Sequence, residues 1–144
     1  MATKQTQAMV DALRAAIAVR EGAAEVGLIE THLSIVFLGR HHVYKLKKPV
    51  RFEFVDYSSL ALREAACRAE LELNRRWSPD VYLDVLPVQR TADGDYDIDR
   101  PGTTVDWLVR MKRLDDSHRL DQLMRNGELT ESVEERLIDH LMAL

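Results

Sequence analysis

Two lysines in the segment 43–48, of sequence VYKLKK, have the type and spacing to bind an anion. The segment has the residue pattern of a β-strand, in which Lys45 and Lys47 point to one face while Tyr44 and Leu46 point to the other. A strand lysine is most often a solvated surface residue, and a basic edge strand also discourages pairing between sheets. A lysine that faces a cleft instead forms charge-assisted hydrogen bonds with phosphate oxygens. The segment alone is compatible with both interpretations.

A helix that carries several glutamates is predicted soon after this strand. Pro49 ends the strand. Ser58 and Ser59 are suitable N-cap residues for a helix over about 60–76, which contains no Gly or Pro, and Pro79 terminates it. A strand lysine followed by a helix glutamate is the arrangement with which kinase small lobes hold a nucleotide, because the lysine binds the phosphates and the carboxylate orients the lysine.

The first half of the chain provides further elements of an α+β fold. Apolar residues spaced three and four apart predict an amphipathic helix over about 6–20. The segment 28–39 is rich in β-branched and aromatic residues and closes with Gly39, so it is predicted to be one strand. Its connection to the strand at 41–50 is too short to cross over, which predicts an antiparallel hairpin.

The second half of the chain is predicted to add strands and then helices. The segments 81–90 and 103–114 flank a polar stretch with the turn dipeptide Asp93-Gly94, so they are expected to form a second antiparallel pair. Two helices follow from Asp116, the second of them capped by Thr130. We expect the last helix to bury an apolar stripe against this chain or a second copy of it. The stripe consists of Val133, Leu137 and Leu141.

Composition limits the classes of partner. The chain has 144 residues, and its 20 basic and 24 acidic residues give a net charge of −4, which offers no general attraction for nucleic acid or an anionic membrane. The single cysteine, Cys67, excludes an internal disulfide and a cysteine-rich zinc site, and it suits a reducing cytoplasm. No apolar run approaches the ~18 residues of a membrane span, and the N-terminus lacks the pattern of a secretion signal. A cytoplasmic protein without a metal site, a nucleic-acid partner or a membrane partner is expected.

Ordered polar blocks in the chain resemble a known family. They occur in the same order and at matching separations in the N-terminal region of the aminoglycoside-phosphotransferase-like kinases that are often fused to a P-loop ATPase domain. The resemblance extends from about Leu28 to the end of the chain, and Val109–Leu114 is similar to the strand that leads to the hinge. The densest blocks are Glu30-Thr31-His32, Tyr44-Lys45-Leu46-Lys47-Lys48-Pro49, and the run from Glu70 to Arg76 followed by Pro79 and Tyr82.

The resemblance implies a fold and an activity. It implies a kinase-like small lobe over 28–114, preceded by an N-terminal helix and linker over 1–27 and followed by the first helices of a truncated large lobe over 115–144. In the intact protein it implies ATP and Mg²⁺ as ligands, and phosphoryl transfer to a small-molecule or protein acceptor that the sequence does not identify.

The resemblance also assigns nucleotide-binding residues. Lys45 is the first choice for the phosphate-binding lysine, and Lys47 is the second because it shares the face and lies only about 6.6 Å away along the strand. Glu70 is the expected helix carboxylate because it lies in a matching block. Its distance to Lys45 is expected to be ~2.7–4 Å when a nucleotide is bound and longer when no ligand is bound. Glu64 and Glu72 are explained instead by surface pairs with arginines four residues later.

No catalytic residue is expected in this chain. The carboxylates that serve the acceptor and Mg²⁺ belong to the large lobe of a kinase. Asp121 and Asn126 have the spacing of a catalytic loop, but the apolar pattern around them predicts a helix. The alternative function is a non-catalytic interaction or regulatory module derived from a kinase lobe. In either case, an apolar surface where a large lobe would pack favours self-association or a covering partner domain.

Overall fold

The chain folds into two compact units, which are divided between Arg113 and Leu114. The computed structural model describes residues 4–128 and 130–143. The first unit is α+β, with a six-stranded sheet in which every pair of neighbouring strands is antiparallel. The second unit is helical. The expected α+β class with an antiparallel sheet and a packed helix is thus observed.

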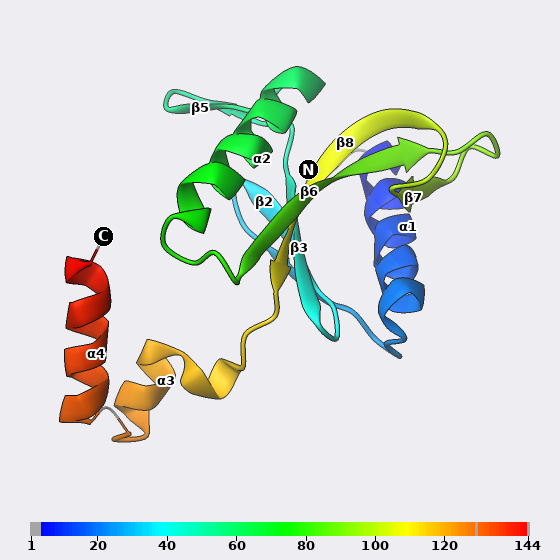
Figure 1. Ribbon diagram of the computed structural model, residues 1–144. Helices are drawn as coiled ribbons and strands as arrows, with labels where there is room; N and C mark the ends of the chain where they lie inside the picture. Colours follow the sequence, from blue (N-terminus) through cyan, green and yellow to red (C-terminus); the bar gives the residue numbers. More distant parts are fainter. Residues whose placement is uncertain (1–3, 129, 144) are drawn as a thin grey trace. The chain divides into compact units, whose positions relative to one another are not determined.

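The six-stranded sheet has the spatial order β1-β2-β3-β8-β6-β7 (Figure 1). Its first three strands follow one another along the chain, whereas β8 lies between β3 and β6 and therefore joins the two halves of the sheet. The strands are β1 (Gly27–Glu30), β2 (Ser34–Leu38), β3 (His42–Lys47), β6 (Tyr82–Arg90), β7 (Tyr96–Ile98) and β8 (Thr103–Lys112).

The segment 28–39, predicted as one strand, forms two. A tight turn separates β1 from β2, because the backbone amide of Thr31 donates to the Ser34 carbonyl at 2.9 Å and the amide of Ser34 donates to Thr31 Oγ1 at 3.0 Å. A threonine hydroxyl that bonds its local backbone in this way competes with strand formation. The predicted hairpin between this segment and the next strand is confirmed, with Val36 opposite Lys45 in the pairing of β2 and β3.

The predicted pairing of 81–90 with 103–114 is also confirmed, since β6 and β8 run side by side over most of their length. Sequence analysis missed β7, which forms within the connecting segment after a turn at Gly94, whose φ is +82°. It also missed a separate two-stranded ribbon of β4 (Arg51–Phe52) and β5 (Val55–Asp56). Strands of two or three residues are too short to show a period of two in the sequence.

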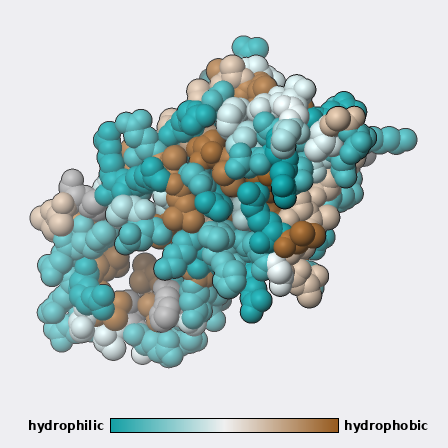
Figure 2. All heavy atoms as spheres, turned by 45° about the vertical axis from the view of Figure 1, so that its right-hand side comes forward, coloured by the Kyte–Doolittle hydropathy of each residue, from teal (hydrophilic) through white to brown (hydrophobic). Residues whose placement is uncertain are grey.

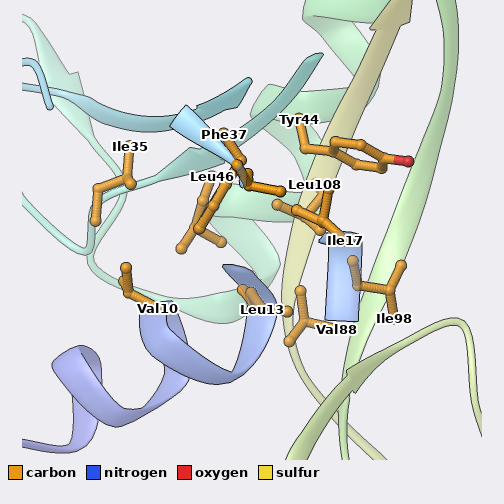
Figure 3. Close-up of a cluster of buried hydrophobic side chains, with 11 residues drawn as sticks. Val10, Leu13, Ile17, Ile35, Phe37, Tyr44, Leu46, Val88, Ile98 and Leu108 are labelled. Atoms are coloured by element: carbon orange, nitrogen blue, oxygen red, sulfur yellow. The ribbon is translucent and has the colours of Figure 1, made fainter. Parts of the chain in front are cut away.

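The helix α1 (Lys4–Glu21) packs against one face of the sheet and forms the main core with it. Its buried residues, Val10, Leu13 and Ile17, follow the helical period expected from the sequence. Burying each such side chain contributes about 1.5–3 kcal/mol. Figure 3 shows how these side chains meet those from the sheet, which are Ile35, Phe37, Tyr44, Leu46, Val88, Ile98 and Leu108.

The helix α2 (Leu60–Arg75) packs against β6 and β8, and Figure 1 shows the sheet between α1 and α2. The helix begins at the predicted N-cap, where Ser59 Oγ accepts a hydrogen bond from the Leu62 amide at 3.2 Å. Its buried residues are Arg63 and Cys67, which face the sheet. Because side chains alternate along β3, α1 contacts the face with Tyr44, and α2 lies over the opposite face.

A buried carboxylate at the end of α1 fixes the β2–β3 hairpin. The side chain of Glu21 is only 3% exposed, and it accepts hydrogen bonds from the His41 amide, His42 Nδ1 and the Tyr44 hydroxyl at 2.7–3.0 Å. A Cβ atom at Gly39 would collide with this carboxylate, which explains the glycine in the hairpin. Burial alone raises the pKa of Glu21, but the hydrogen bonds outweigh it and hold the pKa below the ordinary value of 4.5.

The first prediction concerns the replacement Glu21→Ala. Because the pKa of Glu21 is lowered in the fold, its carboxylate stabilises the protein above the unfolded pKa, and this contribution is lost as the pH falls through the folded pKa. At pH 7 we expect Glu21→Ala to lower the free energy of unfolding in urea by about 2–3 kcal/mol. The difference from the wild type should shrink below about pH 4.5. Glu25→Ala, at an exposed position, is the control, and a pH-independent difference for Glu21→Ala would contradict the assignment.

The second unit contains a 3₁₀ turn (Asp116–His118), α3 (Leu120–Arg125) and α4 (Glu131–Met142). Thr130 caps α4 as predicted. Asp121 lies in α3 and pairs with Arg119 and Arg125. The segment whose Asp121–Asn126 spacing is that of a catalytic loop is therefore helical, as expected. None of the described helices is long and apolar enough to cross a membrane.

The expected burial of the last helix is not observed within the second unit. Leu137 and Leu141 on α4 are exposed, and α4 has no buried residue among those described. A hollow in this unit is lined by Leu123 of α3 and by residues of α4. Burial of the stripe against a second copy of the chain stays a prediction. Exposed apolar side chains occur in the first unit as well, and Figure 2 shows hydrophobic patches between hydrophilic areas on one face of the molecule.

Candidate functional site

The three residues predicted to bind a nucleotide lie together. Lys45 Nζ on β3 lies 2.7 Å from Glu70 Oε1 on α2, and Lys47 Nζ lies 2.5 Å from Glu70 Oε2. Each carboxylate oxygen therefore accepts a hydrogen bond from a different lysine. The cluster joins the central part of the sheet to the helix that covers it.

The regular elements around the cluster fix its geometry. β3 is hydrogen-bonded on both sides, and Lys45 lies opposite Val36 of β2 and Val109 of β8. The alternation along β3 directs Lys45 and Lys47 to the same face. Glu70 follows Cys67 by three residues, which places it one helical turn further along the face of α2 that packs against the sheet. Both lysines thus point toward one carboxylate because of strand and helix periodicity.

The two lysines differ in exposure. The side chain of Lys45 is 28% exposed, whereas that of Lys47 is 6% exposed and that of Glu70 is 15% exposed. The Lys47 ammonium also lies 5.1 Å from the centre of the Tyr57 ring, a distance typical of a cation–π contact. Lys45 is therefore the lysine that an external ligand can reach.

The cluster has an excess positive charge. Burial alone raises the pKa of Glu70, but hydrogen bonds from Lys45 and Lys47 outweigh it, so the pKa of this carboxyl is lowered. Burial alone lowers the pKa of Lys47, but the hydrogen bond and the charge of Glu70 raise it overall. Two ammonium groups therefore face one carboxylate at neutral pH.

Burial raises the pKa of the neighbouring Cys67 thiol to about 11, so this cysteine is protonated and is no nucleophile.

The other glutamates of α2 lie away from this cluster. Glu64 pairs with Arg68 at 2.9 Å, and Glu72 lies 4.0 Å from Arg76. These are the surface pairs between residues four apart that the sequence indicates. Of the three glutamates, Glu70 alone pairs with the strand lysines among the contacts of the described residues.

Sequence analysis missed a buried ion pair next to the cluster. Arg63 Nε on α2 donates to Asp106 Oδ1 on β8 at 2.9 Å, and Arg63 Nη1 donates to the Tyr57 carbonyl at 3.0 Å. The pair links α2 to β8, and Arg63 also holds the backbone at Tyr57, whose ring lies 5.1 Å from the Lys47 ammonium. A single aspartate between apolar residues of a strand was the signal that could have indicated Asp106.

A second missed pair connects the ends of β1 and β3. Lys48 Nζ lies 2.5 Å from Glu30 Oε1, and the Lys48 amide donates to the Leu33 carbonyl at 2.8 Å. These contacts hold the turn between β1 and β2 against the end of β3. Both residues lie in blocks that carry the family resemblance, which was an available signal for their pairing.

A small cavity opens at the end of β3, beside the cluster rather than at its centre. It has a volume of about 170 Å³, and its charged lining residues are Lys47, Lys48, Arg63 and Asp106. Sites for whole small-molecule ligands usually measure ~300–1,000 Å³, so a nucleotide does not fit inside it. No group of three or more potential metal ligands occurs among the described residues. A large ligand at this site would have to approach the exposed side of Lys45.

Comparisons with known proteins give relatives whose names state no activity. The chain is similar to uncharacterized proteins of Mycobacterium bovis and Mycobacterium tuberculosis, with 33% identity over 98 residues in each case. The alignment covers 68% of this chain and 18% of each relative, so the chain spans less than a fifth of the length of these proteins. No family model and no solved structure matches the chain.

Proposed function

We propose that the first unit is the nucleotide-binding small lobe of an aminoglycoside-phosphotransferase-like kinase, which transfers a phosphoryl group from ATP in the intact protein. The observation that carries this proposal is the ion pair between Lys45 on β3 and Glu70 on α2, with a distance of 2.7 Å. In kinases, a lysine on the third strand of the small lobe pairs with a glutamate on the helix that follows, and this pair must be in place for activity.

The order of the elements supports the same proposal. Three consecutive antiparallel strands precede α2 in the first unit, and the lysines lie on the third of them. The strand that follows α2, β6, pairs with β8, which in turn lies beside β3. This arrangement positions a helix carboxylate over the lysines of the third strand, as phosphate binding in a kinase small lobe requires.

The chemistry of the cluster suits a phosphate ligand. Lys45 is accessible, and the excess positive charge of the cluster attracts an anion. Glu70 limits the motion of the Lys45 ammonium, so less side-chain entropy is lost when phosphate oxygens bind. A partly desolvated ammonium forms stronger hydrogen bonds to phosphate than one in bulk water.

Mg²⁺ is not assigned to residues of this chain. The carboxylate of the cluster, Glu70, already faces two lysines, and no group of three or more potential metal ligands occurs among the described residues. In the proposed enzyme, Mg²⁺ would accompany the phosphates of ATP, and protein ligands for it would come from a large lobe, as would the contacts to the acceptor. A cytoplasmic location, where ATP is available, accords with this proposal.

The second prediction tests the role of Glu70 by calorimetric titration with MgATP. We expect Glu70→Gln to weaken MgATP binding by about tenfold, because the amide leaves Lys45 without its charged partner. Glu64→Gln is the matched control on the same helix, and it should bind like the wild type because Glu64 pairs only with a surface arginine. Equal affinities for Glu70→Gln and the wild type would refute a role for Glu70 in binding. If the wild type binds no MgATP, the alternative of a non-catalytic module gains support.

A further inference from the structure

The cluster contains one lysine more than the ion pair of a kinase small lobe requires. Lys47 binds Glu70 Oε2 at 2.5 Å, and Lys45 binds Glu70 Oε1. The two contacts use different oxygen atoms, so neither lysine competes with the other for Glu70. The question is therefore what the second lysine contributes.

We infer that Lys47 is a positioning residue, which holds Glu70 in place and neutralises it so that Lys45 can share its ammonium group with a phosphate. This inference rests on the proposed function, and it assigns different roles to two lysines that share one face of β3. Lys45 binds the ligand, whereas Lys47 stays bound to Glu70 whether or not a ligand is present.

The burial of Glu70 explains why a second lysine is useful. When phosphate oxygens share the Lys45 ammonium with Glu70, the carboxylate loses part of its countercharge. The Glu70 side chain is only 15% exposed, so water compensates poorly for this loss. An uncompensated carboxylate would also repel the incoming anion. With Lys47 on its other oxygen, Glu70 remains neutralised, and sharing the Lys45 ammonium with a phosphate costs less.

The surroundings of Lys47 prevent it from taking the role of Lys45. Its side chain is 6% exposed, and the ring of Tyr57 lies 5.1 Å from its ammonium. Tyr57 is itself tied to the core, because its carbonyl accepts a hydrogen bond from Arg63. Its low exposure makes the Lys47 ammonium less accessible to a phosphate than that of Lys45. Lys45 has no comparable cover among the aromatic contacts of the described residues.

The first test uses the wild-type 144-residue chain, so it does not depend on whether a variant folds. The chain is labelled at its lysine side chains and titrated with inorganic pyrophosphate and then with MgATP, while NMR follows each ammonium group. We expect the Lys45 signal to move with ligand concentration and the Lys47 signal to move much less. A larger movement of Lys47 than of Lys45 would overturn the division of roles.

The second test is a double-mutant cycle on MgATP affinity. We expect Lys47→Met to weaken binding about fivefold, and Lys47→Arg to restore most of the loss because it keeps the charge. In a Glu70→Gln background, Lys47→Met should cause no further loss, since Lys47 acts through Glu70. Lys4→Ala, at an exposed position on α1, is the control. An equal loss in both backgrounds would show that Lys47 acts independently of Glu70, and a lower melting temperature with unchanged affinity would show a structural role only.

A ligand-free measurement separates this inference from the proposed function. If the wild type binds neither pyrophosphate nor MgATP, the proposed function fails, and the pKa of the Glu70 carboxyl, followed by NMR, still tests Lys47. Lys47→Met should raise that pKa more than Lys45→Met does, because the contact with Lys47 is the more buried of the two. A rise that is equal or smaller would refute the positioning role.

Discussion

Replacing Lys45 by methionine is expected to weaken the binding of MgATP by about 10- to 100-fold, which corresponds to the loss of one charge-assisted hydrogen bond of about 1.5–3 kcal/mol. Methionine preserves much of the length of the side chain and removes its charge. Glu70 keeps its bond to Lys47 in this variant, so the free energy of unfolding in urea should change by no more than about 1 kcal/mol. Calorimetric titration and urea denaturation together separate the binding effect from an effect on folding.

The comparison with Lys47 gives this prediction its control. Lys47→Met should weaken MgATP binding less than Lys45→Met, because Lys47 is covered by Tyr57 and reaches Glu70 rather than the ligand. Equal affinities for the wild type and Lys45→Met would remove Lys45 from the site. A larger loss at Lys47 than at Lys45 would instead transfer the phosphate-binding role two residues along β3.

The largest effect on stability is expected from the ion pair of Arg63 and Asp106. The side chain of Arg63 is 10% exposed and that of Asp106 is 5% exposed, so removal of the aspartate leaves a charged guanidinium without its partner in the protein interior. Breaking a buried pair in this way costs about 3–5 kcal/mol. We therefore expect Asp106→Ala to lower the free energy of unfolding by that amount in urea denaturation.

A double variant tests whether charge burial is the cause. Arg63→Met combined with Asp106→Leu removes both charges and fills the space with apolar atoms, so it should cost less than Asp106→Ala alone. Glu64→Ala, which breaks an exposed pair on the same helix, should stay within about 0.5 kcal/mol of the wild type. If Asp106→Ala cost less than about 1 kcal/mol, the pair would not be the anchor of α2 described above.

The sequence predicted the candidate site from two sources, the local periodicity of its elements and the family resemblance. The period of two along β3 places Lys45 and Lys47 on one face, and a well-capped helix without Gly or Pro carries Glu70 over that face. The main helices, the β2–β3 hairpin and the pairing of β6 with β8 follow from the same kind of pattern. Local periodicity therefore predicted which faces meet, whereas the choice of Glu70 among the helix glutamates came from the family resemblance.

The features that were missed depend on long-range contacts or on single side chains. Arg63 and Asp106 are 43 residues apart, so no local pattern joins them. The division of 28–39 into two strands coincides with a turn in which Thr31 bonds Ser34 through both its backbone amide and its hydroxyl. Leu137 and Leu141 of the predicted α4 stripe are exposed within the second unit, because periodicity shows which face of a helix is apolar but not what covers it.

A crystal structure of the chain with a non-hydrolysable MgATP analogue tests the central claim most directly. The quantity to measure is the distance from Lys45 Nζ to the nearest α- or β-phosphate oxygen. We predict a distance of about 2.7–3.2 Å, with Lys47 still bound to Glu70 Oε2. If the phosphates of the analogue bound at another surface, without contact to Lys45, this result would contradict the assignment of the cluster as the phosphate site.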